Sequence, residues 1–305
     1  MASEILGIAS HNTECGYRGR LAPSPTGLLH VGHARTFWTA YCRAREAHGT
    51  LVMRMDDLDA DRSRSEFAEA ALEDLRWLGI RWQEGPDKAG GPHGPYVQSK
   101  RQSLYEAAWR KLLRRGFLYP CRCSRKELVL SASAPHEGLV EDESIYPGTC
   151  RHLSGETAQL PGPTASRYGP EAANWRFRVP DGTVVEFHDW NLGPQRFVAG
   201  VDFGDFLVWR KDNVPSYQLA CTVDDGAMAI TEVVRGADLL KSTARQILLH
   251  KALGYAAPSW YHCTLVADHN GQRLAKRHDA LALRALRARG ITPMNILSAE
   301  LPVMA

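Results

Sequence analysis

The stretch Ala22-Pro-Ser-Pro-Thr-Gly-Leu-Leu-His-Val-Gly-His33 decides how the first part of this 305-residue chain is expected to fold. Before it, residues 17–21 predict a short strand, and its two prolines predict a turn. After it, residues 34–48 predict a helix that Gly49 ends, and residues 51–55 predict a second, buried strand. A strand, a turn, a helix and a strand in this order are typical of a parallel, doubly wound α/β sheet.

The rest of the chain continues this pattern. A second helix is expected from Ser63 to Leu78, with Glu66 completing a capping box at its start. The further expected elements are helices over residues 99–115, 242–253 and 280–289, hairpins over 175–188 and 206–223, and strands over 227–234 and 260–266.

These elements predict a nucleotide-binding α/β domain that is split by an insertion. We expect residues 17–98 and 206–266 to form its two halves. Residues 99–205 are expected to form the inserted subdomain, which contains the cysteine-rich segment. Residues 267–305 are expected to form a loop and a short helical segment.

Composition excludes some classes of protein. The net charge is only +3 and 44% of the residues are hydrophobic, so a full core is possible and any nucleic-acid contact must come from local basic patches. The chain has no apolar run long enough to span a membrane, and its polar N-terminus lacks a signal-peptide core. The seven cysteines are too unevenly placed for a disulfide framework. We therefore expect a soluble, cytoplasmic protein with no membrane partner.

His30 and His33 lie three residues apart, immediately before the helix expected from Ala34. The first-turn amides of a helix have no partner within it, and the helix dipole attracts an anion. Two imidazoles at this position can donate hydrogen bonds to phosphate oxygens, and Gly32 lets the backbone approach a phosphate closely. The alternative interpretation is a helix cap with two incidental histidines.

A basic segment, Arg273-Leu-Ala-Lys-Arg277, follows the polar turn Asp268-His-Asn-Gly-Gln272. A loop that carries a lysine can fold over a triphosphate and follow the departing pyrophosphate. We therefore interpret Lys276 as a catalytic, ATP-binding residue that acts together with His30 and His33. Alone, such a segment is more often a solvated surface.

Together, the two motifs resemble the ATP-binding signatures of class I aminoacyl-tRNA synthetases. From Gly19 to about Ala280 the chain is similar to their glutamyl/glutaminyl branch, although Arg273-Leu-Ala-Lys276 stands where that branch has K-[ML]-S-K, and Arg54-Met-Asp-Asp57 where it has R-I-E-D. Only 28 residues follow Arg277, so the chain is most similar to short members of the branch, and no anticodon-binding domain is expected. The resemblance implies a Rossmann-type catalytic domain with an inserted subdomain like those that bind a tRNA acceptor end.

The resemblance also implies an activity. L-glutamate would react with ATP, with Mg²⁺ present and without tRNA, to give glutamyl-adenylate. The glutamyl group would then pass to the cyclopentenediol of queuosine in the anticodon of tRNA(Asp), and a monomer is expected. The alternatives are a truncated glutamyl-tRNA synthetase that charges tRNA(Glu), a small cofactor adenylyltransferase, and a catalytically silent RNA-binding paralogue. The intact His30, His33 and Lys276 argue against the last of these.

A glutamate pocket needs cations for the side-chain carboxylate and an anion for the ammonium group. The resemblance places glutamate against six residues: Arg20, Ala22, Ser24, Asp56, Tyr217 and Arg235. Asp56 takes the position of the family's glutamate, near the ammonium group. The alternative is an internal salt bridge between Arg20 and Asp56, with Tyr217 in the core.

Cys121, Cys123 and Cys150 offer three thiolates within a short stretch of chain, and zinc prefers four tetrahedral nitrogen or sulfur ligands. The resemblance implies Tyr146 as an unusual fourth ligand of one structural Zn²⁺. His136 and His152 are the chemically easier alternatives, and a metal-free loop is a further one.

Basic residues also cluster in the sequence. Between Ser99 and Lys126 there are nine Lys or Arg residues and one Glu: Lys100, Arg101, Arg110, Lys111, Arg114, Arg115, Arg122, Arg125 and Lys126. This basic stripe suits an RNA backbone, and Arg284, Arg287 and Arg289 could form another basic surface. The alternative for both is a solvated helix face.

Overall fold

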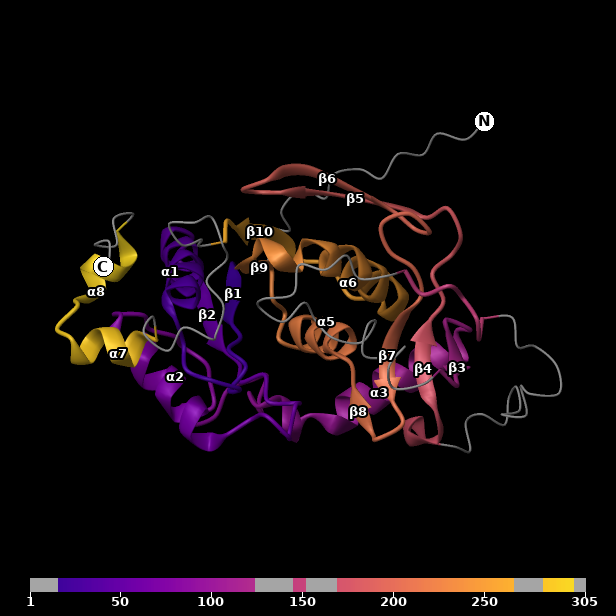
Figure 1. Ribbon diagram of the computed structural model, residues 1–305, viewed down its shortest axis with the longest axis horizontal. Helices are drawn as coiled ribbons and strands as arrows, with labels where there is room; N and C mark the ends of the chain where they lie inside the picture. Colours follow the sequence, from indigo (N-terminus) through magenta and orange to yellow (C-terminus); the bar gives the residue numbers. More distant parts are fainter. Residues whose placement is uncertain (1–15, 124–144, 152–168, 266–281, 299–305) are drawn as a thin grey trace.

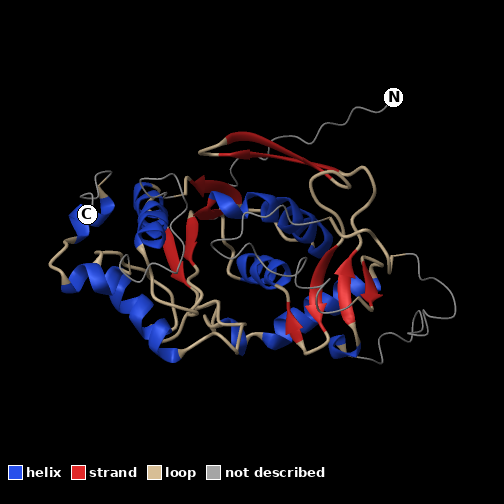
Figure 2. Cartoon of the chain, in the orientation of Figure 1, coloured by secondary structure: helices blue, strands red, loops and turns tan. Residues whose placement is uncertain are grey.

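The computed structural model describes residues 16–123, 145–151, 169–265 and 282–298. Within the described ranges the strands form three sheets (Figures 1 and 2). The first parallel strands lie in the left-hand half of Figure 1, an antiparallel sheet lies on the right, and a long two-stranded hairpin runs along the top. Helices α5 (Tyr217–Ala227) and α6 (Leu240–Leu253) pack against each other between the left-hand strands and the antiparallel sheet.

Two pairs of parallel strands form the first part of the fold. Strand β1 (Arg18–Leu21) pairs with β2 (Thr50–Met53). Strand β9 (Glu232–Gly236) pairs in the same way with β10 (Ser259–Cys263). The strands predicted over residues 17–21 and 51–55 are thus confirmed, whereas the strand predicted from Ala227 begins only at Glu232.

The two pairs meet along β1 and β9. The amide of Thr231 donates to the carbonyl oxygen of Arg18 at 2.8 Å, and Arg20 Nη1 donates to the carbonyl oxygen of Val234 at 2.8 Å. Because the contacts advance along both strands together, β1 and β9 run in the same direction. The predicted parallel α/β sheet is therefore confirmed, and the carboxyl ends of its strands share one edge.

Helix α1 (Val31–Glu46) covers β1 and β9. Its buried residues recur at helical spacing and join the core under the sheet: Val31, Ala34, Phe37, Ala40 and Ala44. The helix begins three residues earlier than the predicted Ala34 because the His30 side chain caps it.

Helix α2 (Ser65–Trp77) confirms the second predicted helix, but the predicted capping box is wrong. Arg64 is the N-cap residue and its side chain makes no capping hydrogen bond. The amides of Ser63 and Arg64 instead donate to the carbonyl oxygens of Asp59 and Pro25 at 2.8 and 2.9 Å. These contacts hold Ser63 in the preceding turn, so the helix starts too late for it to act as a cap.

The second sheet is antiparallel, with strand order β3-β4-β7-β8. Its strands are β3 (Leu118–Cys121), β4 (Asn174–Phe177), β7 (Phe206–Arg210) and β8 (Val214–Pro215). Helix α3 (Gln102–Arg114), preceded by the 3₁₀ turn η1 (Gln98–Lys100), packs on it and confirms the third predicted helix. Trp109, Trp175 and Trp209 are fully buried in the shared core.

The hairpin predicted over residues 175–188 is wrong. All four residues of β4 are buried, and the strand pairs with β3 on one side and with β7 on the other. The turn at Asp181-Gly182 does exist, since the Thr183 amide donates to the Pro180 carbonyl oxygen, but it carries the chain out of this sheet. Strand β5 (Val184–Asp189) then pairs in parallel with β10 and forms a hairpin with β6 (Gly193–Val198).

The hairpin predicted over residues 206–223 is right only in its first part. Strands β7 and β8 pair around residues 211–213. From Tyr217 the chain is helical, because the Ser216 hydroxyl accepts a hydrogen bond from the Leu219 amide and caps α5. Helix α6 confirms the helix predicted over residues 242–253.

The last described stretch, residues 282–298, contains two short helices, α7 (Leu283–Ala288) and α8 (Pro293–Leu297). The helix predicted over residues 280–289 corresponds to α7, whose Arg284 pairs with Glu73 on α2. Across the described ranges, no helix combines the length and apolar character needed to cross a membrane.

Candidate active site

The His30 and His33 side chains both take part in the cap of helix α1. His30 is the N-cap residue, and its Nδ1 accepts the Gly32 amide at 3.0 Å. His33 Nδ1 accepts the amide of His30 at 3.2 Å, and the two rings lie at a tilt of 33° with centroids 3.8 Å apart. With Nδ1 acting as acceptor, each neutral imidazole carries its proton on Nε2. The helix cap and the phosphate site that the sequence suggested are therefore compatible. The capping hydrogen bonds fix the tautomer of each ring, and in that tautomer Nε2–H is a donor.

Gly32 has a steric reason to be glycine. A Cβ atom at this position would lie 2.9 Å from Cε1 and 3.1 Å from Nδ1 of the His30 ring. Any side chain here would push the ring out of its capping position.

Lys276 lies outside the described residues, as do Arg273 and Ala275. The described residues on the far side of that segment lie next to His30. Ala282 forms an isolated bridge with His30, and the Leu283 amide donates to the carbonyl oxygen of Leu29 at 2.8 Å. The chain after Lys276 thus returns to the histidine motif within six residues of the lysine.

A buried ionic cluster lies at the carboxyl ends of β1 and β2. Arg54 holds Asp56 in a two-pronged ion pair and donates to Asp225 at 2.7 Å. Arg20 Nε lies 3.6 Å from Asp225. Burial acts to raise the pKa of Asp225, but the charges of Arg54 and Arg20 outweigh it and hold that pKa below its usual value. The salt bridge considered between Arg20 and Asp56 is not formed, because each side chain has a different partner.

Arg235 lies at the end of β9 and is 5% exposed. Its guanidinium donates only to neutral groups: His262 Nε2, Tyr217 Oη, Gln246 Oε1, the Leu239 carbonyl oxygen and Thr243 Oγ1, at 3.2, 3.4, 2.8, 3.3 and 2.7 Å. Among the described residues, no carboxylate lies within ion-pair distance of it. Burial lowers the pKa of Arg235, and the nearby Arg20 charge adds to this effect. A buried guanidinium without an anion is a strong site for a carboxylate ligand.

The structure brings Tyr217 to Arg235, whose Nη1 donates to the tyrosine Oη at 3.4 Å. Sequence reasoning missed the polar residues behind Arg235, namely Thr243, Gln246, His262 and Asp189. The only available signal was a histidine inside the predicted buried strand of residues 260–266.

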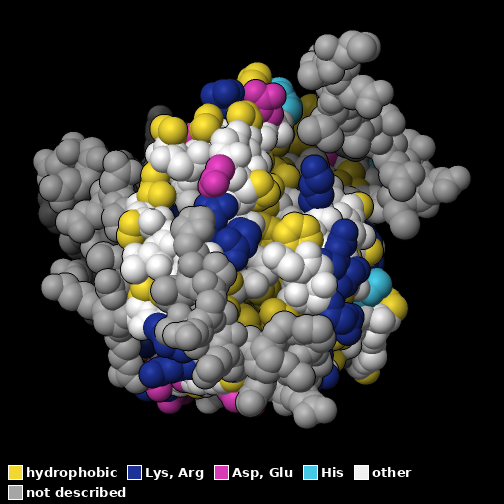
Figure 3. All heavy atoms as spheres, turned by 90° about the vertical axis from the view of Figure 1, so that its right-hand side faces the viewer, with side chains coloured by type: hydrophobic (Ala, Val, Ile, Leu, Met, Phe, Trp, Pro, Cys, Tyr) yellow, Lys and Arg dark blue, Asp and Glu magenta, His cyan; other side chains and the backbone are white. Residues whose placement is uncertain are grey.

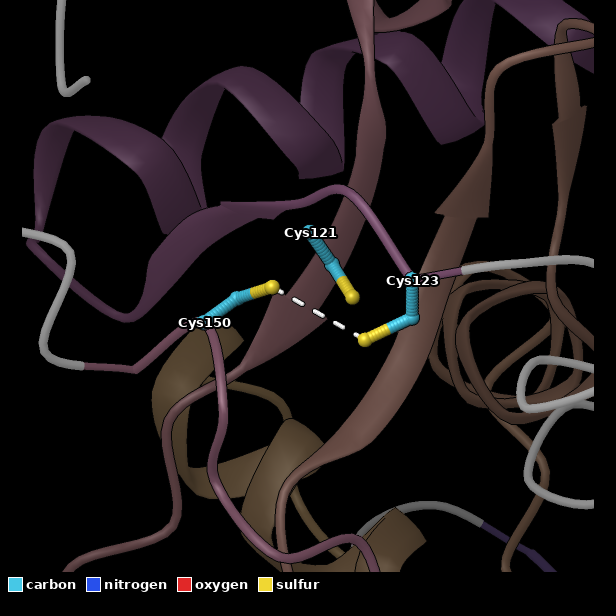
Figure 4. Close-up of side chains that lie close together, drawn as sticks. All are labelled: Cys121, Cys123 and Cys150. Carbon is cyan, nitrogen blue, oxygen red and sulfur yellow. Dashed lines mark hydrogen bonds between the residues drawn. The ribbon is translucent and has the colours of Figure 1, made fainter.

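The three cysteines of the 121–150 segment converge. All Sγ atoms of Cys121, Cys123 and Cys150 lie within 4.8 Å of one another, and Figure 4 shows them directed toward a common centre. Tyr146 Oη lies 3.2 Å from Cys123 Sγ and 3.6 Å from Cys121 Sγ. Three sulfur atoms and one oxygen atom are a donor set that fits a tetrahedral metal ion. His136 and His152 lie outside the described residues.

A buried arginine supports this cluster. Arg176 Nε donates to Cys121 Sγ at 3.3 Å, and its guanidinium lies 3.6 Å from the centroid of the Tyr146 ring. Burial raises the pKa of the Cys123 thiol to about 12, so that the protonated form is favoured until a cation arrives. A positive charge at Arg176 favours the thiolate and phenolate forms that a metal requires.

The predicted basic stripe is only partly at the surface. Arg101 is buried and paired with Asp224, so its assignment to an RNA-binding surface is wrong. Arg110, Lys111, Arg114 and Arg115 are exposed on or next to α3. Figure 3 shows several Lys and Arg side chains, with few acidic ones, on the face at the right of Figure 1. Arg125 and Lys126 lie outside the described residues.

The arginines near the C-terminal end have structural contacts. Arg284 pairs with Glu73, and the Arg287 guanidinium lies 5.6 Å from the centroid of the Trp77 ring. Both contacts fasten α7 to α2, which favours the structural interpretation for this second basic group.

Comparisons with known proteins match this chain to the same family. A family model described as "tRNA synthetases class I (E and Q), catalytic domain" matches residues 17–300. The chain is 49% identical over 279 residues, 92% of its length, to the glutamyl-Q tRNA(Asp) synthetase of Symbiobacterium thermophilum, and covers 84% of that protein. It is equally similar, at 49% identity over 279 residues, to the protein of the same name from Nitratidesulfovibrio vulgaris.

Longer relatives match as well. The chain is 41% identical over 281 residues to glutamate–tRNA ligase 2 of Nitrosococcus oceani, and covers 56% of that protein. The crystal structure of a glutamate tRNA ligase from Elizabethkingia meningosepticum, in complex with its amino acid, superposes with a TM-score of 0.71 at 30% identity. That superposition covers 86% of this chain and 52% of the other, so the chain spans about half the length of the solved structure.

Proposed function

This chain belongs to the class I tRNA synthetases of the glutamate and glutamine (E and Q) type, and from this premise we propose that it activates L-glutamate with ATP and transfers it to queuosine in the anticodon of tRNA(Asp). The first step forms glutamyl-adenylate and releases pyrophosphate. In the second step, a hydroxyl of the cyclopentenediol attacks the adenylate and AMP leaves. The first step needs no tRNA.

The observation that carries this proposal is the 49% identity, over 92% of the chain, to two proteins named glutamyl-Q tRNA(Asp) synthetase. The identity to glutamate–tRNA ligases is lower, at 41%, and the match covers little more than half of their length. The names of the first two relatives favour queuosine of tRNA(Asp) as the acceptor. The amino acid is supported independently by the buried cation of the pocket.

We assign the glutamate side-chain carboxylate to Arg235, with Arg20 as the second cation. The two longest contacts of Arg235, to Tyr217 Oη at 3.4 Å and to the Leu239 carbonyl oxygen at 3.3 Å, come from different terminal nitrogens. A carboxylate can take one donor from each nitrogen, which is the bidentate geometry that arginine favours.

The rest of the amino acid is assigned from the family resemblance. Ala22 and Ser24 line the pocket, and Asp56 acts on the ammonium group while its oxygens hold Arg54. Since Asp56 is engaged by Arg54, a water molecule between Asp56 and the ammonium group is the simplest arrangement.

We assign ATP to His30, Gly32, His33 and Lys276, with Mg²⁺ on the phosphates. An oxygen of the glutamate α-carboxylate attacks the α-phosphorus in line, and pyrophosphate departs on the opposite side. The Nε2–H donors of the two histidines would meet the charge that grows on the α-phosphate oxygens, where each donor contributes about 3–4 kcal/mol. The catalytic power comes from positioning and electrostatics, so no protein nucleophile is required.

We assign one Zn²⁺ to Cys121, Cys123, Tyr146 and Cys150. Bound there, it would cross-link β3 to the segment that carries Tyr146 and Cys150, which is a structural role. We also propose the domain division into residues 17–98, 99–205, 206–266 and 267–305. The enzyme would act as a monomer in the cytoplasm, where its tRNA is found.

The test is to incubate the protein with ATP, labelled glutamate and purified tRNAs. Label should enter tRNA(Asp) from queuosine-proficient cells, and not tRNA(Asp) from queuosine-deficient cells. The second candidate function, favoured by the 41% identity to glutamate–tRNA ligases, is the charging of tRNA(Glu). Label in an unmodified tRNA(Glu) transcript, lost after periodate oxidation of its 3′ end, would support that candidate. ATP–pyrophosphate exchange that never responds to glutamate would indicate a catalytically silent paralogue.

A further inference from the structure

We propose that His262, oriented by Asp189, is a positioning residue that holds the Arg235 guanidinium ready for the substrate carboxylate. This inference rests on the proposed function, because it deepens the role of Arg235. It assigns a purpose to two buried polar side chains that neither the ATP site nor the zinc cluster uses.

The three residues lie on three neighbouring strands. Arg235 is on β9, His262 is its direct partner on β10, and Asp189 ends β5 on the other side of β10. His262 and Asp189 are both fully buried, and Arg235 is 5% exposed. The register pairs Arg235 with His262 and Asp189 with Trp260, two residues before His262, and the Asp189 side chain reaches the His262 ring. An anion, an imidazole and a guanidinium therefore follow one another across the sheet.

Asp189 fixes the orientation of the imidazole. Its Oδ2 lies 2.6 Å from His262 Nδ1, and it also accepts the amides of His262, Asn191 and Leu192 at 3.1, 3.0 and 2.8 Å. Burial acts to raise the pKa of Asp189, but the hydrogen bond from His262 and those from the amides hold it below its usual value. An ionised Asp189 accepts only, so the His262 proton must sit on Nδ1.

The opposite nitrogen then points its lone pair at the arginine. His262 Nε2 lies 3.2 Å from Arg235 Nε and 3.1 Å from Thr243 Oγ1. Thr243 Oγ1 in turn accepts from Arg235 Nη2 at 2.7 Å. Burial and the charge of Arg235 lower the pKa of His262 to about 4, so the ring stays neutral and remains an acceptor at neutral pH.

A neutral acceptor is what this position needs. If a carboxylate contacted Arg235 directly, it would neutralise the guanidinium and compete with the substrate carboxylate. Instead, the His262 imidazole lies between the Asp189 carboxylate and the Arg235 guanidinium and keeps the two charges apart. His262, Gln246 and Thr243 hold three nitrogens of the guanidinium on one side, and the ring of Trp260 lies 4.8 Å from it. The substrate carboxylate then needs to replace only the two longest contacts of Arg235, those to Tyr217 Oη and to the Leu239 carbonyl oxygen.

The experiment compares His262→Ala, His262→Gln and Asp189→Asn with the wild type in ATP–pyrophosphate exchange. His188→Ala is the control, because His188 is an exposed histidine on the neighbouring strand β5. KM for glutamate, KM for ATP, kcat and the melting temperature with and without glutamate are measured for each. We expect His262→Ala to raise KM for glutamate about 10- to 100-fold, since a hydrogen bond to a charged group is lost. KM for ATP should be unchanged.

His262→Gln should recover part of the affinity, because its amide oxygen can accept from Arg235 Nε. Asp189→Asn should shift KM for glutamate in the same direction by a smaller factor. The stabilisation of the protein by added glutamate should fall in the same order as KM rises.

A folded His262→Ala variant with unchanged KM for glutamate would overturn the inference. A raised KM for ATP together with a lowered melting temperature in both His262 variants would also overturn it, because these changes would indicate a structural role only. A wild type without glutamate-dependent exchange would contradict the proposed function itself, and this outcome is distinct from the other two.

Discussion

Arg54 donates two hydrogen bonds to the carboxylate of Asp56, from Nε at 2.6 Å and from Nη2 at 3.0 Å. Its remaining terminal nitrogen donates to Asp225 at 2.7 Å. Arg54 is fully buried, and both carboxylates are at least nine-tenths buried. One cation thus neutralises two acidic groups, one just after β2 and one on α5.

Removing this cation is expected to destabilise the protein strongly. Arg54→Met keeps much of the side-chain volume but leaves Asp56 and Asp225 without their main partner. Breaking a buried pair on one side costs about 3–5 kcal/mol in the free energy of unfolding. Urea denaturation at neutral pH measures this change. Arg62→Met is the control, because Arg62 and Asp59 form an ion pair at the surface and such pairs contribute about 0–1 kcal/mol. Equal losses in the two variants would contradict the central role of Arg54.

The Arg235 site predicts the amino-acid specificity. Exchange should be fastest with glutamate, because glutamine offers Arg235 no anion and aspartate is one methylene too short. Arg235→Gln should raise KM for glutamate by a factor of about 30 or more, the equivalent of about 2–5 kcal/mol for one partner of a buried charge pair. Arg235→Lys should not restore it, since lysine lacks the planar fork. Arg196→Gln, on the exposed face of β6, is the control. Similar exchange rates with glutamate and glutamine would refute the assignment.

Gly32→Ala should lower the rate of catalysis while leaving the free energy of unfolding almost unchanged. A Cβ atom at this position would lie 2.9 Å from the His30 ring, so the ring must turn and its proposed Nε2–H contact with the α-phosphate would be lost. We expect kcat for exchange to fall by at least about tenfold, since one such donor contributes about 3–4 kcal/mol. The free energy of unfolding should change by no more than about 1 kcal/mol, because the higher helix propensity of alanine offsets a strained cap. Full activity in a stable Gly32→Ala protein would remove His30 from the phosphate site.

The parts of the fold that the sequence predicts are those with strong local signals. Helix α1 has a long amphipathic run, and a glycine follows both α1 and α6, at Gly49 and at Gly254, which caps α6 with a φ of 71°. The hairpin over residues 175–188 failed for a different reason. Its turn is real, but whether two strands pair across a turn depends on what covers their other edges, and β3 and β7 already cover β4.

Some residues of the candidate site could also be predicted from local sequence patterns, and others could not. His30 and His33 are close in sequence, so their spacing and the helix that follows predict the cap. Asp189, His262 and Arg235 meet only through the register of three strands, with 73 residues between the first two. No local pattern carries that information. The domain boundaries, the role of Lys276 and the fourth zinc ligand stay predictions.

Asp74 predicts a pH dependence of stability. Its carboxylate is fully buried on α2 and finds no hydrogen-bond donor among the residues that the structure describes. Burial raises its pKa to about 6 in spite of the nearby Arg284 charge. Because the folded protein holds this proton more tightly than the unfolded chain does, Asp74 destabilises the fold as the pH rises from about 4 through 6. Asp74→Asn should therefore stabilise the protein by about 1–2 kcal/mol at pH 8, and the gain should vanish near pH 4. Melting curves across this range test the prediction. A gain that is independent of pH would assign the effect to packing.

Zinc content tests the cysteine cluster. The wild type should bind one zinc per chain, and Cys123→Ser should lose it, because only two thiolates would remain. Tyr146→Phe keeps the ring over which Arg176 stacks but removes the oxygen, so it isolates coordination from packing. We expect zinc affinity in Tyr146→Phe to fall clearly, and affinity in the wild type to fall with pH, because protons compete for the thiolates and the phenolate. Metal analysis and competition with a chelator measure both effects. Cys42→Ser, at a cysteine on α1 apart from the cluster, is the matched control and should retain its zinc. If zinc survives Tyr146→Phe but is lost in His136→Ala or His152→Ala, the fourth ligand is a histidine and the tyrosine is only a neighbour.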